Sequence, residues 1–202
     1  MPIKGKPLLD IWINKLCNVG VKNFFINTHY LHEQVNEFVS RNELKEKIQL
    51  SHELELLGTA GTLLNNLNFF KEEDSFFIYA DNYCEDKLEE FILAHLNRPK
   101  ECLMTMMTFR TDDFESSGIV KVDDYGIVRN YYEKEKHSEG NLANGAVFIF
   151  SKEFISFLKA GDYKGEDFSK DILSRLINKI YTYETKDLFL DIGSVKNYLS
   201  VT

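Results

Sequence analysis

Two aspartates are the strongest candidates for catalytic or metal-binding residues in this sequence. Asp81 follows the apolar run at residues 75–80, and Asp191 lies within the apolar stretch at residues 189–192. Ligands of open α/β sheets bind beyond the carboxyl ends of the strands, so Asp81 points to the expected site. Two carboxylates from distant segments could hold one Mg²⁺, which prefers oxygen ligands and keeps waters for a phosphate substrate. The alternative is that each aspartate caps a following helix.

A turn of small residues, Gly58-Thr59-Ala60-Gly61-Thr62, opens into a predicted helix. Glycine has no side chain and tolerates unusual dihedral angles, so this backbone could lie against a flat or anionic ligand. The turn lacks the lysine of a Walker loop and does not form a GxGxxG fingerprint. A ligand-binding turn and a plain helix start both stay open.

Polar residues also gather near the ends of predicted hairpin strands. Glu133-Lys134 and Asn144-Gly145 carry the groups that hydrogen-bond sugar hydroxyls. The alternative is an ordinary solvated face.

Histidine and cysteine patterns favour neither zinc binding nor nucleophilic catalysis. His29 and His32 are three residues apart, which is common by chance, and nothing in the sequence places His52 near them. No GxSxG or Cys-His arrangement appears. The cysteines are odd in number and lack CxxC spacing, so they are interpreted as reduced thiols: Cys17, Cys84 and Cys102.

Composition limits the class of protein further. The 202 residues are 44% hydrophobic and 28% charged, which indicates one ordinary globular domain. The net charge of −8 argues against a general nucleic-acid binder, which needs a basic face. No apolar run has the length of a membrane span, and no signal-peptide core begins the chain. We expect a cytoplasmic protein with neither nucleic-acid nor membrane partners.

The elements that must position these residues alternate between helix and strand. Helical periodicity at residues 9–17 is followed by strands at 23–27, 48–52 and 75–80 with helices between them. Strands then follow one another at 102–109, 119–122, 127–132 and 145–150, which indicates hairpins. The pattern predicts an α/β fold: a Rossmann-like, mainly parallel sheet sandwiched by helices, with an antiparallel hairpin portion in the second half.

Six segments, in this order, resemble the sugar-1-phosphate nucleotidyltransferases. The segments are residues 1–9, 55–63, Ala80-Asp81-Asn82, Tyr132-Glu133-Lys134, residues 144–148 and residues 191–194. The resemblance covers essentially the whole chain. It implies a nucleotide-diphospho-sugar transferase-like fold and transfer of a nucleotidyl group from an NTP to a sugar 1-phosphate, with release of pyrophosphate.

The same resemblance implies roles for the candidate residues. Mg²⁺ would be the cofactor, held by Asp81 and Asp191. The nucleotide would be contacted through backbone groups of Gly58, Thr59 and Gly61. The sugar would be held by Glu133, Lys134 and Asn144. The Leu-Gly-Thr-Ala-Gly form favours guanylyl transfer, whereas the sugar is not identified and a homo-oligomer stays open.

Two alternatives come from other classes. One is a binding or regulatory homologue that keeps the nucleotide and sugar pockets without turnover. The other is a metal-dependent glycosyltransferase, which usually has Asp-x-Asp on its metal strand. Asp81-Asn82-Tyr83 does not supply that motif.

The family opens with a strand and a GxGTRxxPLT loop that neutralises the triphosphate, and this sequence opens on a predicted helix instead. We therefore expect residues 1–202 to be one N-terminally truncated nucleotidyltransferase domain, with Met1 an internal methionine. A deliberately shortened chain, a miscalled start codon and gene decay all fit this expectation. Because neighbouring strands would lack a partner, the chain alone is expected to be poorly stable and essentially inactive.

This expectation can be checked in the DNA. The in-frame codons upstream of Met1 should encode about two dozen residues that form a strand and a Gly-rich loop with Arg and Lys. A stop codon directly before Met1, with no frameshifted remnant farther upstream, would remove the miscalled-start explanation.

Overall fold

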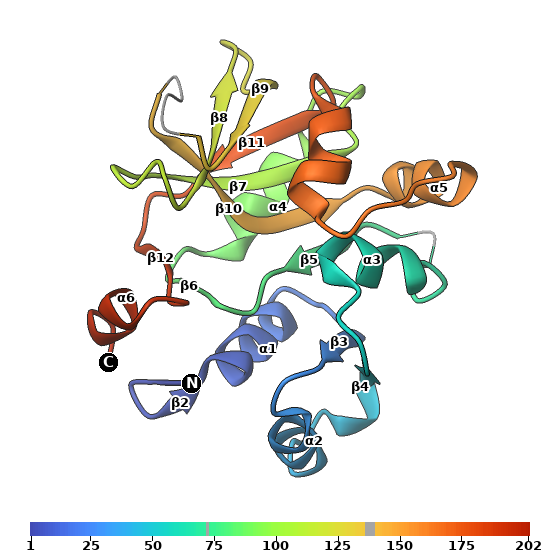
Figure 1. Cartoon of the computed structure of the whole chain (residues 1–202), viewed down its shortest axis with the longest axis vertical. Helices are drawn as coiled ribbons and strands as arrows, with labels where there is room; N and C mark the ends of the chain where they lie inside the picture. The colour runs from blue at the N-terminus through green and yellow to red at the C-terminus, as the bar shows by residue number, and fades with distance from the viewer. Residues whose placement is uncertain (72, 136–139) are drawn as a thin grey trace.

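Helices and strands alternate through the first half of the chain, and strands dominate from residue 104 onward (Figure 1). The computed structural model describes residues 1–71, 73–135 and 140–202. The strands are β1 Pro2–Ile3, β2 Lys6–Pro7, β3 Phe24–Thr28, β4 Ile48–His52, β5 Ser75–Ile78, β6 Asn82–Cys84, β7 Met104–Arg110, β8 Gly118–Val122, β9 Val128–Glu133, β10 Leu142–Phe150, β11 Ile180–Glu184 and β12 Phe189–Asp191. The helices are α1 Leu8–Asn18, α2 His32–Ser40, α3 Gly58–Asn65, α4 Leu88–Leu96, α5 Lys152–Ala160 and α6 Val195–Leu199, with short 3-10 helices at Lys45–Lys47 and Leu173–Leu176 and a π-helical turn at Phe168–Ile172.

The larger sheet is organised around β10. The second half of β10 lies between β5 and β7, with Val147 opposite Ile78. Its first half lies between β7 and β8, where Ala143 pairs with Ile119. β8 and β9 form the predicted hairpin, and β11 runs parallel to β7. The α/β class with a hairpin portion is confirmed. The sheet is mixed and not mainly parallel, because β10 runs antiparallel to its three neighbours while β7 and β11 are parallel.

Both faces of β10 are buried under helices. Val147 and Ile149 belong to a core beneath α1 and α4, whereas Phe148 and Phe150 belong to a second core beneath α3 and α5. Neighbouring residues of a strand point to opposite faces, so an unbroken apolar run supplies both cores. The predicted sandwich of helices around the sheet follows from this run.

β3 and β4 form a separate parallel pair beside α1 and α2 (Figure 1). Among the residues that the structure describes, β3 pairs with no strand but β4, and β5 with none but β10. One edge of each strand therefore lacks a strand partner. The expected poor stability of the isolated chain depends on such edges and stays a prediction.

The first seven residues form a hairpin that the periodicity did not predict. β1 pairs with β2 around Lys4-Gly5, whose φ angles of 47° and 80° suit a tight hairpin turn. The hydroxyl of Tyr198 in α6 donates to the carbonyl oxygen of Pro2 at 2.9 Å, so the two chain ends lie together (Figure 1).

The length and hydrophobicity of the helices determine whether any of them could cross a membrane. α1 has 11 residues, about half of what a membrane-spanning helix needs. Within the described ranges, no helix is long and apolar enough to cross a bilayer.

A buried histidine joins three elements on the side of the sheet covered by α4. His95 of α4 bonds through Nδ1 to the hydroxyl of Thr105 at 2.8 Å and through Nε2 to Oδ2 of Asp74 at 3.2 Å. Oδ1 of Asp74 accepts from the N–H of Lys152 at 3.1 Å. The hydrogen bond with His95 is the first cause that holds the pKa of Asp74 below its ordinary value.

We predict that Asp74→Asn lowers the melting temperature at pH 7 by about 3 °C, which corresponds to about 1 kcal/mol. A carboxyl whose pKa is depressed in the folded state contributes stability above its unfolded pKa, near 4, and loses it as the pH falls through the folded value. The difference between wild type and variant should therefore shrink below about pH 4 in thermal melts run from pH 7 to pH 3. Asp162→Asn, at a carboxylate whose side chain is 87% exposed, is the control and should change little. A wild-type–variant difference that is constant with pH would contradict this account.

Candidate active site

The pairing of β6 with β12 brings Asp81 and Asp191 together. Asp191 lies opposite Asn82, the residue that follows Asp81. The N–H of Ile192 donates to the carbonyl oxygen of Asp81 at 2.9 Å. A Cβ atom placed on Gly193 would lie 3.0 Å from Oδ1 of Asp191 and 3.9 Å from Oδ2 of Asp81. Both carboxylates thus approach the same stretch of bare backbone.

The charges of the two aspartates act on each other. Loss of hydration and, second, the negative charge of Asp191 raise the pKa of Asp81. No cluster of three or more His, Cys, Asp or Glu suited to a metal ion occurs in the part of the chain that the structure describes. Mg²⁺ is commonly held by one or two carboxylates and completes its shell with waters and phosphate oxygens. The pair of oxygen donors fits that ion.

Neither aspartate caps a helix, so the capping alternative is wrong. Asp81 is followed by β6, and α6 is capped by Ser194, whose Oγ accepts from the N–H of Asn197 at 3.2 Å. Oδ1 of Asp191 accepts instead from the N–H of Gly193 at 2.7 Å, within a local turn.

Helix α1 fixes the strand that follows Asp81. The indole N–H of Trp12 donates to the carbonyl oxygen of Asn82 at 2.7 Å. The ammonium of Lys15 donates to the carbonyl oxygens of Cys84 at 2.6 Å and Asp86 at 2.7 Å. Two bonds from this helix thus hold β6 and a third holds Asp86 just beyond it, which fixes the backbone beside Asp81.

Tyr79 marks the place where the predicted groups converge. Burial raises the pKa of its phenol to about 12, and a hydrogen bond to Thr59 acts in the opposite direction. Three negative charges contribute to the rise: Asp167, Glu133 and Asp81. One side chain is therefore within electrostatic reach of a predicted metal ligand, a predicted nucleotide residue and a predicted sugar residue.

The small-residue turn packs against residues 165–168. Gly58 has a φ of 73°, and a Cβ atom there would lie 2.2 Å from the carbonyl oxygen of Glu166. That oxygen accepts from the N–H of Ala60 at 2.9 Å, and the hydroxyl of Thr59 accepts from the N–H of Phe168 at 2.9 Å. Glycine is required at position 58 by the approach of the chain itself. The turn does begin a helix, α3, and its contact with a nucleotide stays a prediction.

Buried Glu53 holds the same turn from the other side. Its carboxylate accepts from the hydroxyl of Thr62 at 2.5 Å and from the N–H of Leu57 at 3.3 Å. A Cβ atom on Gly61 would lie 3.0 Å from Cβ of Leu57. The turn is therefore rigid before any ligand arrives.

Glu133 and Asn144 meet at the hydroxyl of Tyr131. This hydroxyl donates to Oε2 of Glu133 and accepts from Nδ2 of Asn144 at 3.5 Å. Oδ1 of Asn144 accepts from the N–H of Ala146 at 2.8 Å, inside an irregular stretch of β10 where Ala146 has a φ of 50°. The structure thus joins two of the three predicted sugar-binding residues.

Lys134, the third predicted sugar-binding residue, is exposed just beyond β9 with a φ of 53°. No hydrogen bond or ion pair links its ammonium to another residue in the described ranges. Its side chain is free to turn toward a ligand.

Nothing in the sequence placed His52 near His29 and His32, but the structure brings His52 into contact with His32. The parallel pairing of β3 with β4 sets Thr28 beside His52, and the ring of His32 stacks on that of His52 with centroids 3.8 Å apart. His29 bonds through Nδ1 to the carbonyl oxygen of Glu53 at 2.7 Å. The sequence could not show this because strand pairing, not spacing, brings the rings together.

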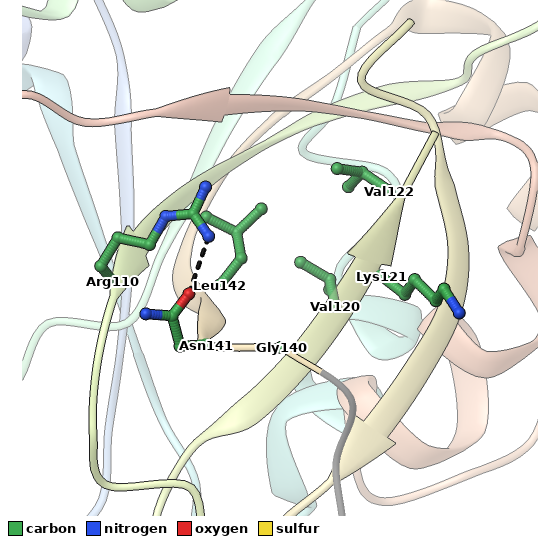
Figure 2. A pocket seen from close by; sticks show the side chains of 7 residues that line it. All are labelled: Arg110, Val120, Lys121, Val122, Gly140, Asn141 and Leu142. Carbon is green, nitrogen blue, oxygen red and sulfur yellow. Dashed lines mark hydrogen bonds between the residues drawn. The ribbon is translucent and has the colours of Figure 1, made fainter. Parts of the chain in front are cut away.

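The well-formed cavities lie elsewhere. Figure 2 shows one of about 250 Å³ between β7, β8 and β10, where Arg110 donates to Asn141 beside Val120 and Leu142. Another, of about 740 Å³, lies between α1 and α2. None of the eight predicted site residues lines either cavity. The candidate site is instead an open surface that carries the Asp81–Asp191 pair.

The sequence analysis missed Tyr79 and Tyr131. Each precedes a predicted site residue, Asp81 or Glu133, by two positions. Tyr131 and Glu133 both lie on β9, whereas Tyr79 and Asp81 lie in the turn between β5 and β6. Residues two apart on a strand share a face, so this alternation was the signal that could have found Tyr131.

Known proteins resemble the chain over its full length. The profile of the family described as Nucleotidyl transferase matches residues 1–202. The D-glycero-alpha-D-manno-heptose 1-phosphate guanylyltransferase of Campylobacter jejuni is 29% identical over 98% of this chain and 85% of its own length. The mannose-1-phosphate guanylyltransferase catalytic subunit beta of Drosophila melanogaster is 25% identical over 97% of this chain, which spans 53% of that protein.

A solved structure agrees with these relatives. The crystal structure of HddC from Yersinia pseudotuberculosis complexed with GMP-PN matches with a TM-score of 0.79 and 25% identity, covering 100% of this chain and 86% of that chain.

We predict that Gly58→Ala lowers the free energy of unfolding by more than Gly5→Ala. Both glycines have positive φ, 73° and 80°, but an added Cβ meets Glu166 at position 58 and nothing within 4 Å at position 5. The shared backbone strain costs about 1 kcal/mol, and the clash at Gly58 should add at least as much again. Urea unfolding of both variants measures the difference. Equal losses would show that residue 166 does not press against the turn.

Proposed function

Because the chain belongs to the Nucleotidyl transferase family, we propose that it transfers a guanylyl group from GTP to a sugar 1-phosphate and releases pyrophosphate. The observation that carries this proposal is the juxtaposition of Asp81 and Asp191 beside Tyr79, which is also within reach of Thr59 and Glu133. The guanylyl specificity is supported by the guanylyltransferase activity of the two relatives and by the GMP-PN complex of the Yersinia structure.

The electrostatics of the site support a cation. Asp81, Asp191, Glu133 and Asp167 all contribute negative charge around the same few residues. A nucleoside triphosphate and a sugar phosphate are anions and would be repelled by these carboxylates alone. Asp81 and Asp191 would hold Mg²⁺, which supplies positive charge to the phosphate oxygens when bound.

Little covalent chemistry falls to the protein in this reaction. A phosphate oxygen of the sugar 1-phosphate attacks the α-phosphate of GTP, and the bond to the pyrophosphate leaving group breaks. The side chains gain rate by holding the two reactants in line and by neutralising charge. We assign the orientation of the sugar to Glu133, Lys134 and Asn144.

The nucleotide would lie against the turn at Gly58, Thr59 and Gly61. Glu53 and the segment 165–168 already hold this turn in place. A rigid turn loses little freedom when a ligand binds, which favours affinity.

We also propose that residues 1–202 act as one nucleotidyltransferase domain in the cytoplasm. Two buried cysteines support a reducing compartment, since Cys84 and Cys102 are free thiols and burial raises the pKa of each to about 11.

We predict that, in a full-length form of the protein, Asp81→Asn lowers pyrophosphate release from GTP, mannose 1-phosphate and Mg²⁺ by about 10²–10³-fold. The amide keeps the shape of the side chain but carries no charge for the cation. Because the folded protein disfavours the ionised form of Asp81, the melting temperature should stay the same or rise.

The exposed turn variant Asp124→Asn is the matched control and should keep wild-type turnover. Near-normal catalysis by Asp81→Asn would reject the metal assignment. A wild-type chain that binds GTP and sugar phosphate without releasing pyrophosphate would favour the binding homologue instead.

A further inference from the structure

The hydroxyl of Tyr131 stands between two side chains that the proposed function assigns to the sugar. Tyr131 and Glu133 share a face of β9, and Asn144 comes from β10. The hydroxyl donates to Oε2 of Glu133 and accepts from Nδ2 of Asn144, and Ser169 lies within hydrogen-bonding reach of it. One phenol thus fixes both groups.

The neighbouring strand leaves space for this arrangement. Gly118 of β8 pairs with Glu133, and a Cβ atom on Gly118 would lie 2.2 Å from the hydroxyl of Tyr131 and 2.9 Å from Oε2 of Glu133. Glycine inside a strand weakens the strand and often marks a close approach. Any side chain at position 118 would displace the Tyr131–Glu133 pair.

The bonds already made determine what the pair can still offer. Oε1 of Glu133 has no hydrogen bond to a residue in the described ranges and remains an acceptor. The amide of Asn144 has its oxygen occupied by Ala146 and keeps one N–H as a donor. An acceptor beside a donor matches a hydroxyl, which both donates and accepts.

We propose that Tyr131 is a positioning residue, which holds Glu133 and Asn144 as one unit for recognition of a sugar hydroxyl. This inference rests on the proposed function. Burial and the Glu133 carboxylate raise the pKa of Tyr131, so the phenol keeps its proton and remains a donor to Glu133.

The test is Tyr131→Phe in the full-length form, which removes one oxygen and keeps the ring. We expect the KM for mannose 1-phosphate to rise about tenfold, with kcat and the KM for GTP within about twofold of wild type. The preference for mannose 1-phosphate over the monodeoxy analogue that lacks the recognised hydroxyl should fall about tenfold. Tyr125→Phe removes the same atom from an exposed turn residue outside the predicted site and should change none of these values.

A double-mutant cycle separates positioning from a general structural effect. In a Glu133→Gln background, Tyr131→Phe should raise the KM by much less than tenfold, because Tyr131 acts through that carboxylate. Additive effects, or wild-type kinetics for Tyr131→Phe, would overturn the inference while leaving the proposed function in place. A full-length wild type that neither binds nor turns over mannose, glucose or heptose 1-phosphate would overturn the proposed function, and this inference with it.

Discussion

The repulsion between Asp81 and Asp191 is the constraint on which the site depends. Two carboxylates kept near the same backbone destabilise the fold unless other contacts hold them there. The pairing of β12 with β6 supplies those contacts, and buried Phe189 anchors β12 by stacking on Phe109 at 4.8 Å. The fold therefore stabilises an arrangement whose repulsion the proposed cation would relieve.

Two positions are occupied by glycine because another part of the chain packs closely against them, and not because a ligand does. The absence of a side chain at Gly58 leaves room for the backbone of Glu166, and its absence at Gly118 leaves room for the hydroxyl of Tyr131. Each approach makes a rigid support for a group that faces the proposed substrates: the turn before α3 in the first case and Glu133 in the second. A glycine-rich segment can thus serve ligand binding indirectly, by holding the neighbours of the ligand.

The sequence predicted much of the fold because its signals are local. Apolar runs at β5, β7 and β10 and the helical stripe of α1 depend on neighbouring residues and were identified correctly. Long-range pairing was not predictable in the same way. The mixed character of the sheet follows from β10, which lies between β5 and β7 and pairs antiparallel with both. The stacking of His32 on His52 likewise depends on which strands pair.

In the candidate site, too, the sequence indicated single residues but not which of them lie together. Asp81 and Asp191 were recognisable by type and position, but only the β6–β12 register shows that they meet. Tyr131 was missed because an aromatic residue in a strand usually indicates packing, and its hydroxyl has a role only beside Glu133 and Asn144. The sequence alone identifies candidate residues by their type, whereas the fold is needed to show which of them lie side by side.

Paramagnetic broadening by Mn²⁺ in the amide NMR spectrum tests the central claim most directly. Mn²⁺ accepts the same oxygen ligands as Mg²⁺ and broadens signals near its site. The account predicts that substoichiometric Mn²⁺ broadens the amides of residues 81–82 and 191–193 together, and that the Asp81→Asn, Asp191→Asn double variant loses this effect. Broadening of one segment without the other, or broadening that persists in the double variant, would contradict the shared cation site.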